Sequence, residues 1–319
     1  MLGEVQETTT LDAAAVRPLT AVTALAWYDG RQNIRLYYQD TAGRVVEACG
    51  TDGSWVPGAV LTGAAPGSKL ATTTWRDGGG VHIRLYYQDA RGALGELCYD
   101  DGDGWYTGRL AVTGAAPGTG IAAVSWRNPE GDVHIRVYYQ DTASNLAEQC
   151  NDHGVWTVGG LSQGTGTLST GIAAAQWTDD AGFHIRVYWV DADILSYPVV
   201  ALSSYDNGQW TVVSLTKIIT DDASELALLQ WTDGPGRGHQ RIAYQASLSV
   251  IDHALDNDVY AGHAFGAPPA PGTGIALARF TDSAGDHVRL FYQSPQNAIL
   301  EYAQDFGAWQ DQPTVVTAG

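Results

Sequence analysis

The chain has 319 residues, of which 16% are charged, and its formal net charge is −18 at pH 7. This negative charge argues against nucleic acid and anionic membrane surfaces as partners, because both are bound chiefly through Lys and Arg. The many Gly (38), Trp (11) and Tyr (16) residues favour short strands joined by tight turns over long helices.

Residues 1–20 precede the repeated part of the chain, and we expect them to form an N-terminal arm. This segment lacks a basic start followed by an apolar run, so it does not predict a signal peptide. No apolar span in the sequence approaches the length needed to cross a membrane. We therefore expect a cytoplasmic location by default, with unconventional secretion left open.

From residue 21 onward one segment, of the form His-Ile-Arg-Val-Tyr-Tyr-Gln, recurs six times. The copies are centred on Arg35, Arg84, Arg136, Arg186, Arg241 and Arg289. Subtraction of these numbers gives separations of 49, 52, 50, 55 and 48 residues. A fixed period of about 40 to 50 residues is typical of a propeller or a solenoid.

Each copy contains four short strand-like runs. In the third copy they lie at 121–126, 133–140, 145–150 and 155–159, with turn residues at 128–131. Four antiparallel strands in each of six repeats predict an all-β, six-bladed propeller. We expect one propeller over residues 21–319, with blades at about 21–62, 70–113, 120–162, 171–216, 225–266 and 274–317.

Two copies depart from the common length. The fourth has an insertion, which we place around residues 199–204, and the fifth loses one residue between Arg241 and its carboxylate. An aromatic residue ends the first strand of every copy, and we expect these residues to pack between blades. They are Trp27, Trp75, Trp126, Trp177, Trp231 and Phe280.

Strand alternation decides which polar residues can meet. In the second copy Arg84 and Glu96 are expected to face one neighbouring blade, while Ile83 and Tyr99 face the other. Each groove between blades would then hold an Arg and a Glu from one blade and an apolar wall from the next. Such donors and acceptors suit adjacent sugar hydroxyls, and the wall suits a methyl group or the carbon face of the ring.

These residues resemble the fungal fucose-specific lectins of the orange-peel mushroom lectin type and their short bacterial relatives. The resemblance rests on the strand IAAVSW, the strand HIRVYYQD, a Glu 12 residues after the Arg, and a closing Gly-x-Trp such as Gly154-Val155-Trp156. It implies a propeller that binds α-linked fucose between blades without calcium or another cofactor. It also implies that Arg and Glu bind sugar hydroxyls, that the closing Trp comes from the next blade, and that the C6 methyl group lies against apolar side chains.

Carried over by position, the resemblance implies four binding grooves. The first would contain Arg35, Glu47, Ile83, Tyr99 and Trp105. The second would contain Arg84, Glu96, Ile135 and Trp156. The third would contain Arg136, Glu148, Ile185, Tyr205 and Trp210. The last would close the ring with Arg289, Glu301, Ile34 and Trp55.

The remaining two grooves are expected to be degenerate. Arg186 is followed by Ser196, or by Leu202 if the insertion precedes the third strand, so it lacks a carboxylate in either alignment. Arg241 is matched by Asp252, which is one methylene shorter than Glu. The aromatic residues at the closing position are Tyr260 in the fifth copy and Trp309 in the sixth. We expect the Arg186 groove to be silent and the Arg241 groove to be weak or empty.

Two other sets of side chains recur with the repeat. A His precedes five of the arginines by two residues, and we expect it to orient the Arg rather than to bind a metal. These are His82, His134, His184, His239 and His287. Cys49, Cys98 and Cys150 occupy one position in three copies and are expected to be buried thiols, too far apart for a disulfide.

The leading interpretation is a multivalent, metal-free lectin without enzymatic activity. Its expected partners are fucose-containing oligosaccharides and glycoproteins, and a homodimer is left open. One alternative is a propeller that binds proteins through its rim. A glycosidase is less favoured, because hydrolysis needs two carboxylates whereas each groove offers one Glu. Pairing with Arg is also expected to keep that Glu ionised.

Overall fold

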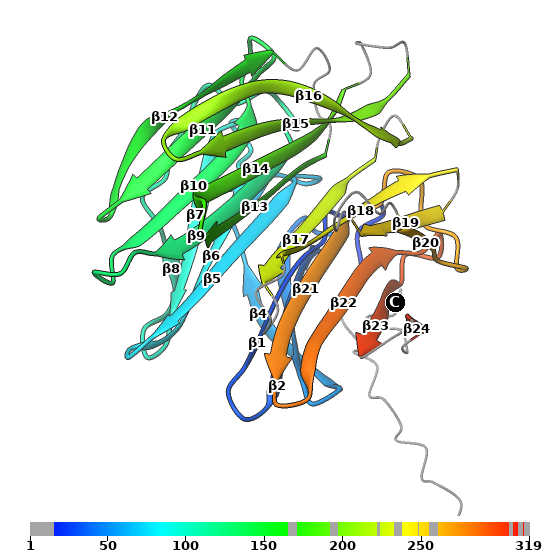
Figure 1. Cartoon of the computed structure of the whole chain (residues 1–319). Helices are drawn as coiled ribbons and strands as arrows, with labels where there is room; N and C mark the ends of the chain where they lie inside the picture. Colours follow the sequence, from blue (N-terminus) through cyan, green and yellow to red (C-terminus); the bar gives the residue numbers. More distant parts are fainter. Residues whose placement is uncertain are drawn as a thin grey trace, which may run out of the picture.

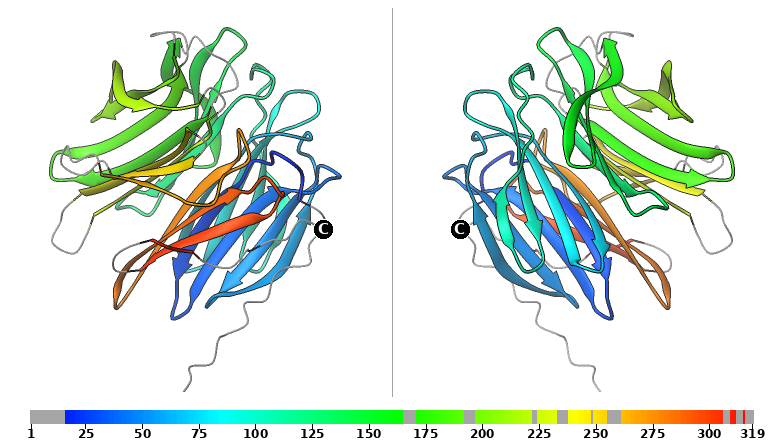
Figure 2. Two further views of the ribbon diagram at one scale, coloured as in Figure 1. Left: turned by 90° about the vertical axis from the view of Figure 1, so that its right-hand side faces the viewer. Right: turned by 90° about the vertical axis from the view of Figure 1, so that its left-hand side faces the viewer.

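Six four-stranded antiparallel sheets lie around a central axis in the computed structural model (Figures 1 and 2). The structure describes residues 16–164, 171–191, 197–221, 224–232, 238–247, 249–254, 261–305, 309–311 and 315. The strands of every sheet follow one another in chain order. The first strand of each sheet contacts the first strands of its two neighbours, so the sheets form a ring. The prediction of a six-bladed propeller is confirmed.

The first three blades are regular. Blade I comprises β1 (Thr23–Tyr28), β2 (Gln32–Gln39), β3 (Val45–Thr51) and β4 (Ser54–Leu61). Blade II comprises β5 (Leu70–Asp77), β6 (Gly80–Gln88), β7 (Leu94–Asp100) and β8 (Gly104–Thr107). Blade III comprises β9 (Ile121–Arg127), β10 (Val133–Gln140), β11 (Asn145–Asp152) and β12 (Val155–Gly164).

The last three blades vary more in strand length. Blade IV comprises β13 (Ile172–Asp179), β14 (Gly182–Asp191), β15 (Val199–Asp206) and β16 (Gln209–Ile219). Blade V comprises β17 (Leu226–Thr232), β18 (Gly238–Ala246), β19 (Ser249–Ala254) and β20 (Ala261–Ala264). Blade VI comprises β21 (Ile275–Asp282), β22 (Gly285–Gln293), β23 (Ile299–Asp305) and β24 (Gln310–Asp311).

The insertion of the fourth copy lies before β15, because β14 ends at Asp191 and β15 begins at Val199. The placement of this insertion around residues 199–204 was therefore wrong, since these residues belong to β15 itself, and the alternative placement before the third strand is confirmed. The apolar run that begins at Val199 pairs with β14 along its length and cannot be looped out. With β15 beginning at Val199, Leu202 is paired with Tyr188.

Tight turns join the third and fourth strands of several blades. In blade I, Asp52 and Gly53 have positive φ angles of 48° and 80°, and in blade IV Asn207 and Gly208 have 49° and 100°. Two consecutive residues at positive φ match the hairpin turn whose twist suits the flanking strands.

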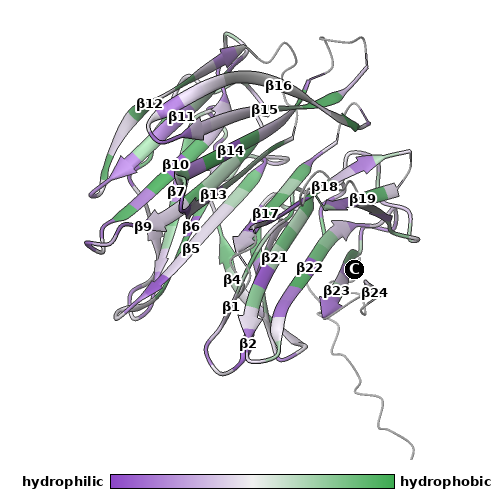
Figure 3. Cartoon of the chain, in the orientation of Figure 1, coloured by the Kyte–Doolittle hydropathy of each residue, from purple (hydrophilic) through white to green (hydrophobic). Residues whose placement is uncertain are grey.

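Apolar side chains fill the interfaces between neighbouring blades. One cluster joins Leu36 and Ile34 of blade I to Phe291 of blade VI, and another joins Val137 of blade III to Tyr86 of blade II. Figure 3 shows hydrophobic segments along β14, β17 and β22. Each blade therefore depends on both neighbours for its core. Over the described ranges, no helix is long and apolar enough to cross a membrane.

Residues 16–20 close the ring instead of forming a separate arm. The Gln293 side chain of blade VI donates to the carbonyl of Arg17 at 2.9 Å. The side chains of Gln39 and Gln88 donate in the same way to the carbonyls of Ala65 and Ala116, in the segments that join blade I to blade II and blade II to blade III. Val16 is 2% exposed and packs between the last and first blades. The rest of the expected arm, residues 1–15, lies outside the described residues.

An ion pair spans the mouth of the central channel. Lys69 precedes β5 of blade II and Glu225 precedes β17 of blade V, on opposite sides of the ring, and their side chains meet. These side chains are 23% and 13% exposed. The first strands of all six blades line a small axial cavity of about 110 Å³. The ion pair thus links two blades that are not neighbours.

Candidate functional site

Alternation along the second strand of each blade sends an arginine and an aliphatic residue into different grooves. Ile83 lines a cavity between blades I and II, whereas Arg84 lines a cavity between blades II and III. We number the grooves 1 to 6 by the blade that supplies the arginine. The arginines of grooves 1 to 6 are Arg35, Arg84, Arg136, Arg186, Arg241 and Arg289.

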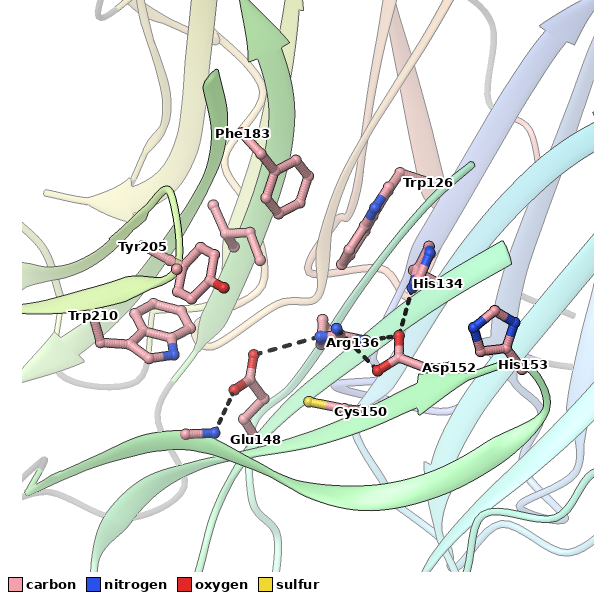
Figure 4. A pocket seen from close by; sticks show the side chains of 13 residues that line it. Trp126, His134, Arg136, Glu148, Cys150, Asp152, His153, Phe183, Tyr205 and Trp210 are labelled. Atoms are coloured by element: carbon pink, nitrogen blue, oxygen red, sulfur yellow. Dashed lines mark hydrogen bonds and ion pairs between the residues drawn. The ribbon is translucent and has the colours of Figure 1, made fainter. Parts of the chain in front are cut away.

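Groove 3, between blades III and IV, brings all its predicted residues together around a cavity of about 600 Å³ (Figure 4). The Nε atom of Arg136 lies 4.0 Å from Oε1 of Glu148. The Nη1 atom of the same arginine donates to Oδ1 of Asp152 at 2.9 Å. The guanidinium group therefore lies between two carboxylates of its own blade.

Backbone and tyrosine donors fix the carboxylate of Glu148. The hydroxyl of Tyr138 donates to Oε1 at 3.1 Å, and the backbone N–H of Gly160 donates to Oε2 at 3.0 Å. A side chain at Gly159 would collide with this carboxylate, so the chain needs glycine there. Glu148 is 4% exposed, and its position is set before any ligand arrives.

Blade IV supplies the apolar wall of groove 3. Tyr205 and Trp210 lie side by side, with ring centroids 5.3 Å apart, and Ile185 lines the same cavity. The rings of Trp210 and of Tyr138 in blade III also pack edge to face, with centroids 6.1 Å apart. The structure places Tyr205 and Trp210 in the register that the sequence suggested. A polar fork on one blade thus faces an aromatic and aliphatic surface on the next.

A histidine and a tryptophan brace the arginine from its own blade. The guanidinium carbon of Arg136 lies 4.8 Å from the ring centre of Trp126, against which His134 also stacks. His134 shares Asp152 with the arginine, through a contact of 2.5 Å at Nδ1. Burial raises the pKa of Asp152, but its hydrogen bonds to His134 and Arg136 more than offset this and lower the pKa overall.

The bracing aspartate was missed in the sequence, although its signal is regular. Among the described residues it lies four residues after the glutamate position in four blades, and in each it pairs with the arginine at 2.8 to 3.0 Å. These aspartates are Asp100, Asp152, Asp206 and Asp305. Blade I has Thr51 at this position. The orienting role expected of the histidines agrees with this geometry for four of them, which contact these aspartates. They are His82, His134, His184 and His287.

Groove 2 has the same polar core and a cavity of about 650 Å³. Arg84 pairs with Asp100 at 3.0 Å, and Glu96 accepts hydrogen bonds from the hydroxyl of Tyr86 and the backbone N–H of Arg109. Ile135 and Trp156 of blade III line the opposite wall. The indole N–H of Trp156 has no acceptor in the described part of the chain.

Groove 1 is smaller, with a cavity of about 200 Å³. Nε of Arg35 lies 3.9 Å from Oε1 of Glu47. Ile83 and Tyr99 line the facing wall, and the ring of Trp105 lies 5.6 Å from that of Tyr99. The predicted residues are again brought together.

Groove 6 contains the expected residues in a more closed arrangement. Nε of Arg289 lies 3.4 Å from Oε1 of Glu301, and the indole N–H of Trp55 donates to Oε2 of the same carboxylate at 3.2 Å. Arg289 is 6%, Glu301 7%, Trp55 3% and Ile34 1% exposed. Burial raises the pKa of Glu301 to about 7 and outweighs the opposing effects of Arg289 and Trp55. Arg289 therefore does not hold Glu301 fully ionised at neutral pH, in contrast to the expectation for the glutamates.

Grooves 4 and 5 depart from the pattern, each in its own way. In groove 4, Leu202 pairs with Tyr188 as Glu148 pairs with Tyr138, so Leu202 occupies the glutamate position. In groove 5, Asp252 accepts a hydrogen bond from Arg241 at 2.9 Å and another from the indole N–H of Trp309 at 3.0 Å. Groove 4 thus has no carboxylate at the glutamate position. In groove 5 the carboxylate of Asp252 already accepts hydrogen bonds from Arg241 and Trp309. Ser196 and Tyr260 lie outside the described residues.

The first-strand aromatics do more than pack between blades. Trp126 contacts Phe183 of the next blade at 4.5 Å, as expected, but it also lies against Arg136 of its own blade. Trp27 and Trp75 contact Arg35 and Arg84 in the same manner. We had assigned these residues to interblade packing, and stacking on the arginine is a second role.

The three cysteines are free and line grooves 1, 2 and 3. Burial raises the pKa of Cys49 to about 11 and those of Cys98 and Cys150 to about 12, so these thiols stay protonated at neutral pH. Among the residues that the structure describes, no group of three or more His, Cys, Asp or Glu side chains is placed to hold a metal ion.

Comparison with known proteins gives consistent matches. A family model described as fungal fucose-specific lectin matches residues 8–212. A fucose-specific lectin of Aleuria aurantia is 32% identical over 200 residues, which cover 59% of this chain and 61% of the relative. A fucose-specific lectin of Aspergillus oryzae is 28% identical over 297 residues, covering 88% of this chain and 91% of the relative.

A solved structure supports the same fold. A mutant of the Aleuria aurantia lectin, in complex with alpha-methyl-L-fucoside, superposes with a TM-score of 0.81 at 23% identity. The superposition covers 96% of this chain and 98% of that one. Because the sequence identity is low, this likeness concerns the propeller architecture.

Proposed function

The chain belongs to the fungal fucose-specific lectin family, and on this premise we propose that it is a multivalent lectin for L-fucose and fucosylated glycans. The observation that carries the proposal is the arrangement in groove 3. A braced arginine and a fixed glutamate of one blade face Ile185, Tyr205 and Trp210 of the next. The same plan recurs in grooves 1 and 2.

The chemistry of this arrangement suits a deoxy sugar. The guanidinium group of Arg136 offers several N–H donors in a planar fork, and Glu148 offers acceptor oxygens, so the pair can bind two adjacent hydroxyl groups. An apolar wall stabilises a methyl group that would otherwise be exposed to water. Aromatic rings such as Trp210 also give the carbon face of a sugar a surface to lie on.

Four grooves are assigned to sugar binding in this proposal. Grooves 1, 2, 3 and 6 have both the arginine and the glutamate, whereas groove 4 has Leu202 and groove 5 has Asp252. Groove 6 is expected to be the weakest of the four, because its arginine and carboxylate are buried and Trp55 already donates to Glu301. Groove 4 is expected to be silent and groove 5 weak or empty.

Binding without catalysis is the activity that the carboxylates of groove 3 support. The expectation of a single carboxylate per groove was wrong, since groove 3 also holds Asp152. Asp152 accepts hydrogen bonds from Arg136 and its pKa is lowered, so it is not suited to donate a proton as a glycosidase acid would. Glu148 is fixed by donors on its own blade and stands beside the same arginine.

Several sites on one rigid ring are expected to act together on a surface. Each site alone would be weak to moderate, and simultaneous engagement of several glycans raises the effective affinity. The proposed partners are fucose-containing oligosaccharides and glycoproteins. The proposed binding requires no metal ion, and association into a homodimer would increase the valency further.

Red-cell agglutination tests this function. The chain should agglutinate cells, free L-fucose should inhibit the agglutination, and a chelator should leave it unchanged. The protein should also be retained on a fucose column and eluted by L-fucose. Absence of both agglutination and retention would contradict the lectin and favour a propeller that binds proteins through its rim.

A further inference from the structure

The histidine behind groove 2 contacts a carboxylate at each of its ring nitrogens. Nε2 of His82 lies 3.0 Å from Oδ1 of Asp77, at the end of β5, and Nδ1 contacts Oδ1 of Asp100, at the end of β7. We call Asp77 the outer aspartate and Asp100 the inner aspartate. The inner aspartate is the one that pairs with Arg84. The imidazole ring therefore connects the first hairpin of blade II to the carboxylate that braces the arginine.

Grooves 1 and 3 lack one or both parts of this arrangement. Blade I has Asn33 at the histidine position, opposite the first-strand tryptophan. In blade III, Nδ1 of His134 contacts Asp152, but the residue two positions after the first-strand tryptophan is Asn128. The side chain of Asn128 exchanges hydrogen bonds with Asp132 instead. Within the described ranges, no carboxylate contacts Nε2 of His134.

Two carboxylates around one imidazole ring favour its charged form. A charged histidine has two N–H donors and a neutral one has a single donor, so loss of the proton leaves one bare nitrogen facing a carboxylate oxygen. Burial acts to lower the pKa of His82, but the hydrogen bonds from Asp100 and Asp77 outweigh burial and raise this pKa overall. The pKa of Asp77 is lowered, first of all by its hydrogen bond to His82. Deprotonation of His82 must therefore weaken at least one of its two contacts.

The inner aspartate transmits this change to the sugar-binding arginine. Asp100 accepts a hydrogen bond from Nη1 of Arg84 at 3.0 Å and another from the hydroxyl of Tyr106. Arg84 lines the cavity of groove 2, and Asp77 reaches it only through His82 and Asp100. The orientation of the guanidinium group thus depends on the charge of the histidine.

Other charged groups also lie near these side chains. Arg127 of blade III has its Nη1 atom 4.0 Å from Oδ2 of Asp77, and an arginine keeps its charge throughout the range in which histidine titrates. His153 of blade III approaches Asp132 to 3.5 Å and lines both groove 2 and groove 3. A titration of His153 would therefore affect both grooves, and a comparison of the two isolates the effect of His82.

We propose that Asp77 is a positioning residue for sugar binding in groove 2, and that it acts through His82 and Asp100 to make the affinity of this groove fall when His82 loses its proton. Groove 1, which lacks the histidine, and groove 3, which lacks the outer aspartate, would keep their affinity over the same range of pH. The inference rests on the fucose-binding function proposed above. It assigns one groove a pH dependence that the other two do not share.

Fluorine NMR of the chain labelled with 5-fluorotryptophan tests this inference site by site. Trp105 lies beside Tyr99 in groove 1, Trp156 lines groove 2 and Trp210 lines groove 3, and substitution of each tryptophan by Phe assigns its signal. The protein is titrated with methyl α-L-fucoside at pH 5.5 and pH 9. The Kd at Trp156 should be about fivefold higher at pH 9, as expected for the loss of one ordinary hydrogen bond. The Kd values at Trp105 and Trp210 should change by less than about twofold, because neither groove has the full arrangement.

Two variants test the chain of contacts. In Asp77→Asn, the amide can donate to the bare Nε2 of neutral His82, so the Kd at Trp156 should become similar at the two pH values. His82→Asn introduces the residue found in blade I and should also remove the pH dependence. The matched control is Asp179→Asn in blade IV, where Oδ1 of Asp179 lies 3.1 Å from Nε2 of His184 behind the groove expected to be silent. This control should leave the fivefold change at Trp156 intact.

Three results would overturn the inference while leaving the lectin function standing. They are a Kd at Trp156 that does not change with pH, a change that persists in Asp77→Asn, and an equal change at Trp210. If methyl α-L-fucoside moved none of the three signals at either pH, the proposed lectin function itself would be overturned.

Discussion

Asp152 holds the guanidinium group of Arg136 on the side away from Glu148, with Nη1 to Oδ1 and Nη2 to Oδ2 distances of 2.9 and 3.3 Å (Figure 4). The long arginine side chain is thereby fixed before ligand binding, which lowers the entropy lost when a sugar is bound. His134 contacts the same carboxylate and stacks on Trp126. The binding fork of groove 3 is therefore a preorganised unit of four side chains.

Asp152→Asn should weaken binding in groove 3 because it removes the charge that fixes Arg136. A hydrogen bond to a charged group contributes about 1.5 to 3 kcal/mol, so we expect a loss of about tenfold or more in affinity. The loss should appear for methyl α-L-fucoside in fluorine NMR of the chain labelled with 5-fluorotryptophan. Trp210 lines groove 3 and reports it there, and its signal is assigned by Trp210→Phe. The control is Asp103→Asn, at an exposed turn in blade II. Unchanged affinity at Trp210 would refute the positioning role of Asp152.

Gly108→Ala should disable groove 2 while the neighbouring Gly114→Ala does not. A methyl group at Gly108 would collide with the carboxylate of Glu96, whereas nothing lies within 4 Å of the corresponding atom at Gly114. Isothermal titration calorimetry with methyl α-L-fucoside should show one site fewer per chain for the first variant only. Full stoichiometry in Gly108→Ala would show that the position of Glu96 does not matter for binding.

Glu301 should make the stability of the propeller depend on pH. Its pKa is about 7 in the folded chain and 4.5 in the reference state. Between these values the folded protein binds more protons than the unfolded chain, so its stability falls as pH rises, by about 3 kcal/mol in total. Glu301→Gln stays neutral and should lose this decline.

Urea unfolding of both proteins at pH 5 and pH 8 measures the effect. The difference in unfolding free energy, variant minus unmodified chain, should be more positive at pH 8. Because the other titrating groups are common to both proteins, they cancel in this comparison. An equal difference at the two pH values would contradict an elevated pKa at Glu301.

The ion pair between Lys69 and Glu225 should stabilise the ring across its axis. Lys69→Met leaves Glu225 in a largely buried position without its partner, which we expect to cost about 1 to 3 kcal/mol. The double variant Lys69→Met with Glu225→Gln should recover part of the loss. Urea unfolding of the two single variants and the double variant gives the coupling energy, and a value near zero would show that the two side chains do not interact in solution.

The repeat period and the strand alternation were sufficient to predict the propeller and the faces of Arg, Glu, Ile and Tyr, whereas the closing Trp of each groove was implied by the family resemblance. Arg136, Glu148 and Ile185 could be placed because alternation in paired strands is a local rule. The register of Leu202 could not be decided, since it depends on where β15 begins. The hydrogen bond from Trp55 to Glu301, which buries both side chains, could not be predicted from the sequence either. It depends on how blade VI and blade I pack against each other.

Asp152 was missed for a different reason. Its spacing from Glu148 recurs in blades II and VI, so the signal was present in the sequence. Each arginine was expected to pair with one carboxylate, although a guanidinium group has enough donors for two. A count of donors against acceptors in each repeat would have identified the aspartates.

The number of methyl α-L-fucoside molecules bound per chain, measured by isothermal titration calorimetry, tests the central claim most directly. Four grooves have both an arginine and a glutamate, so the account predicts a stoichiometry near four, which falls by one in Arg84→Ala and stays the same in Arg186→Ala. A stoichiometry near six, or an Arg84→Ala variant that keeps the full number of sites, would contradict the assignment of binding to these grooves.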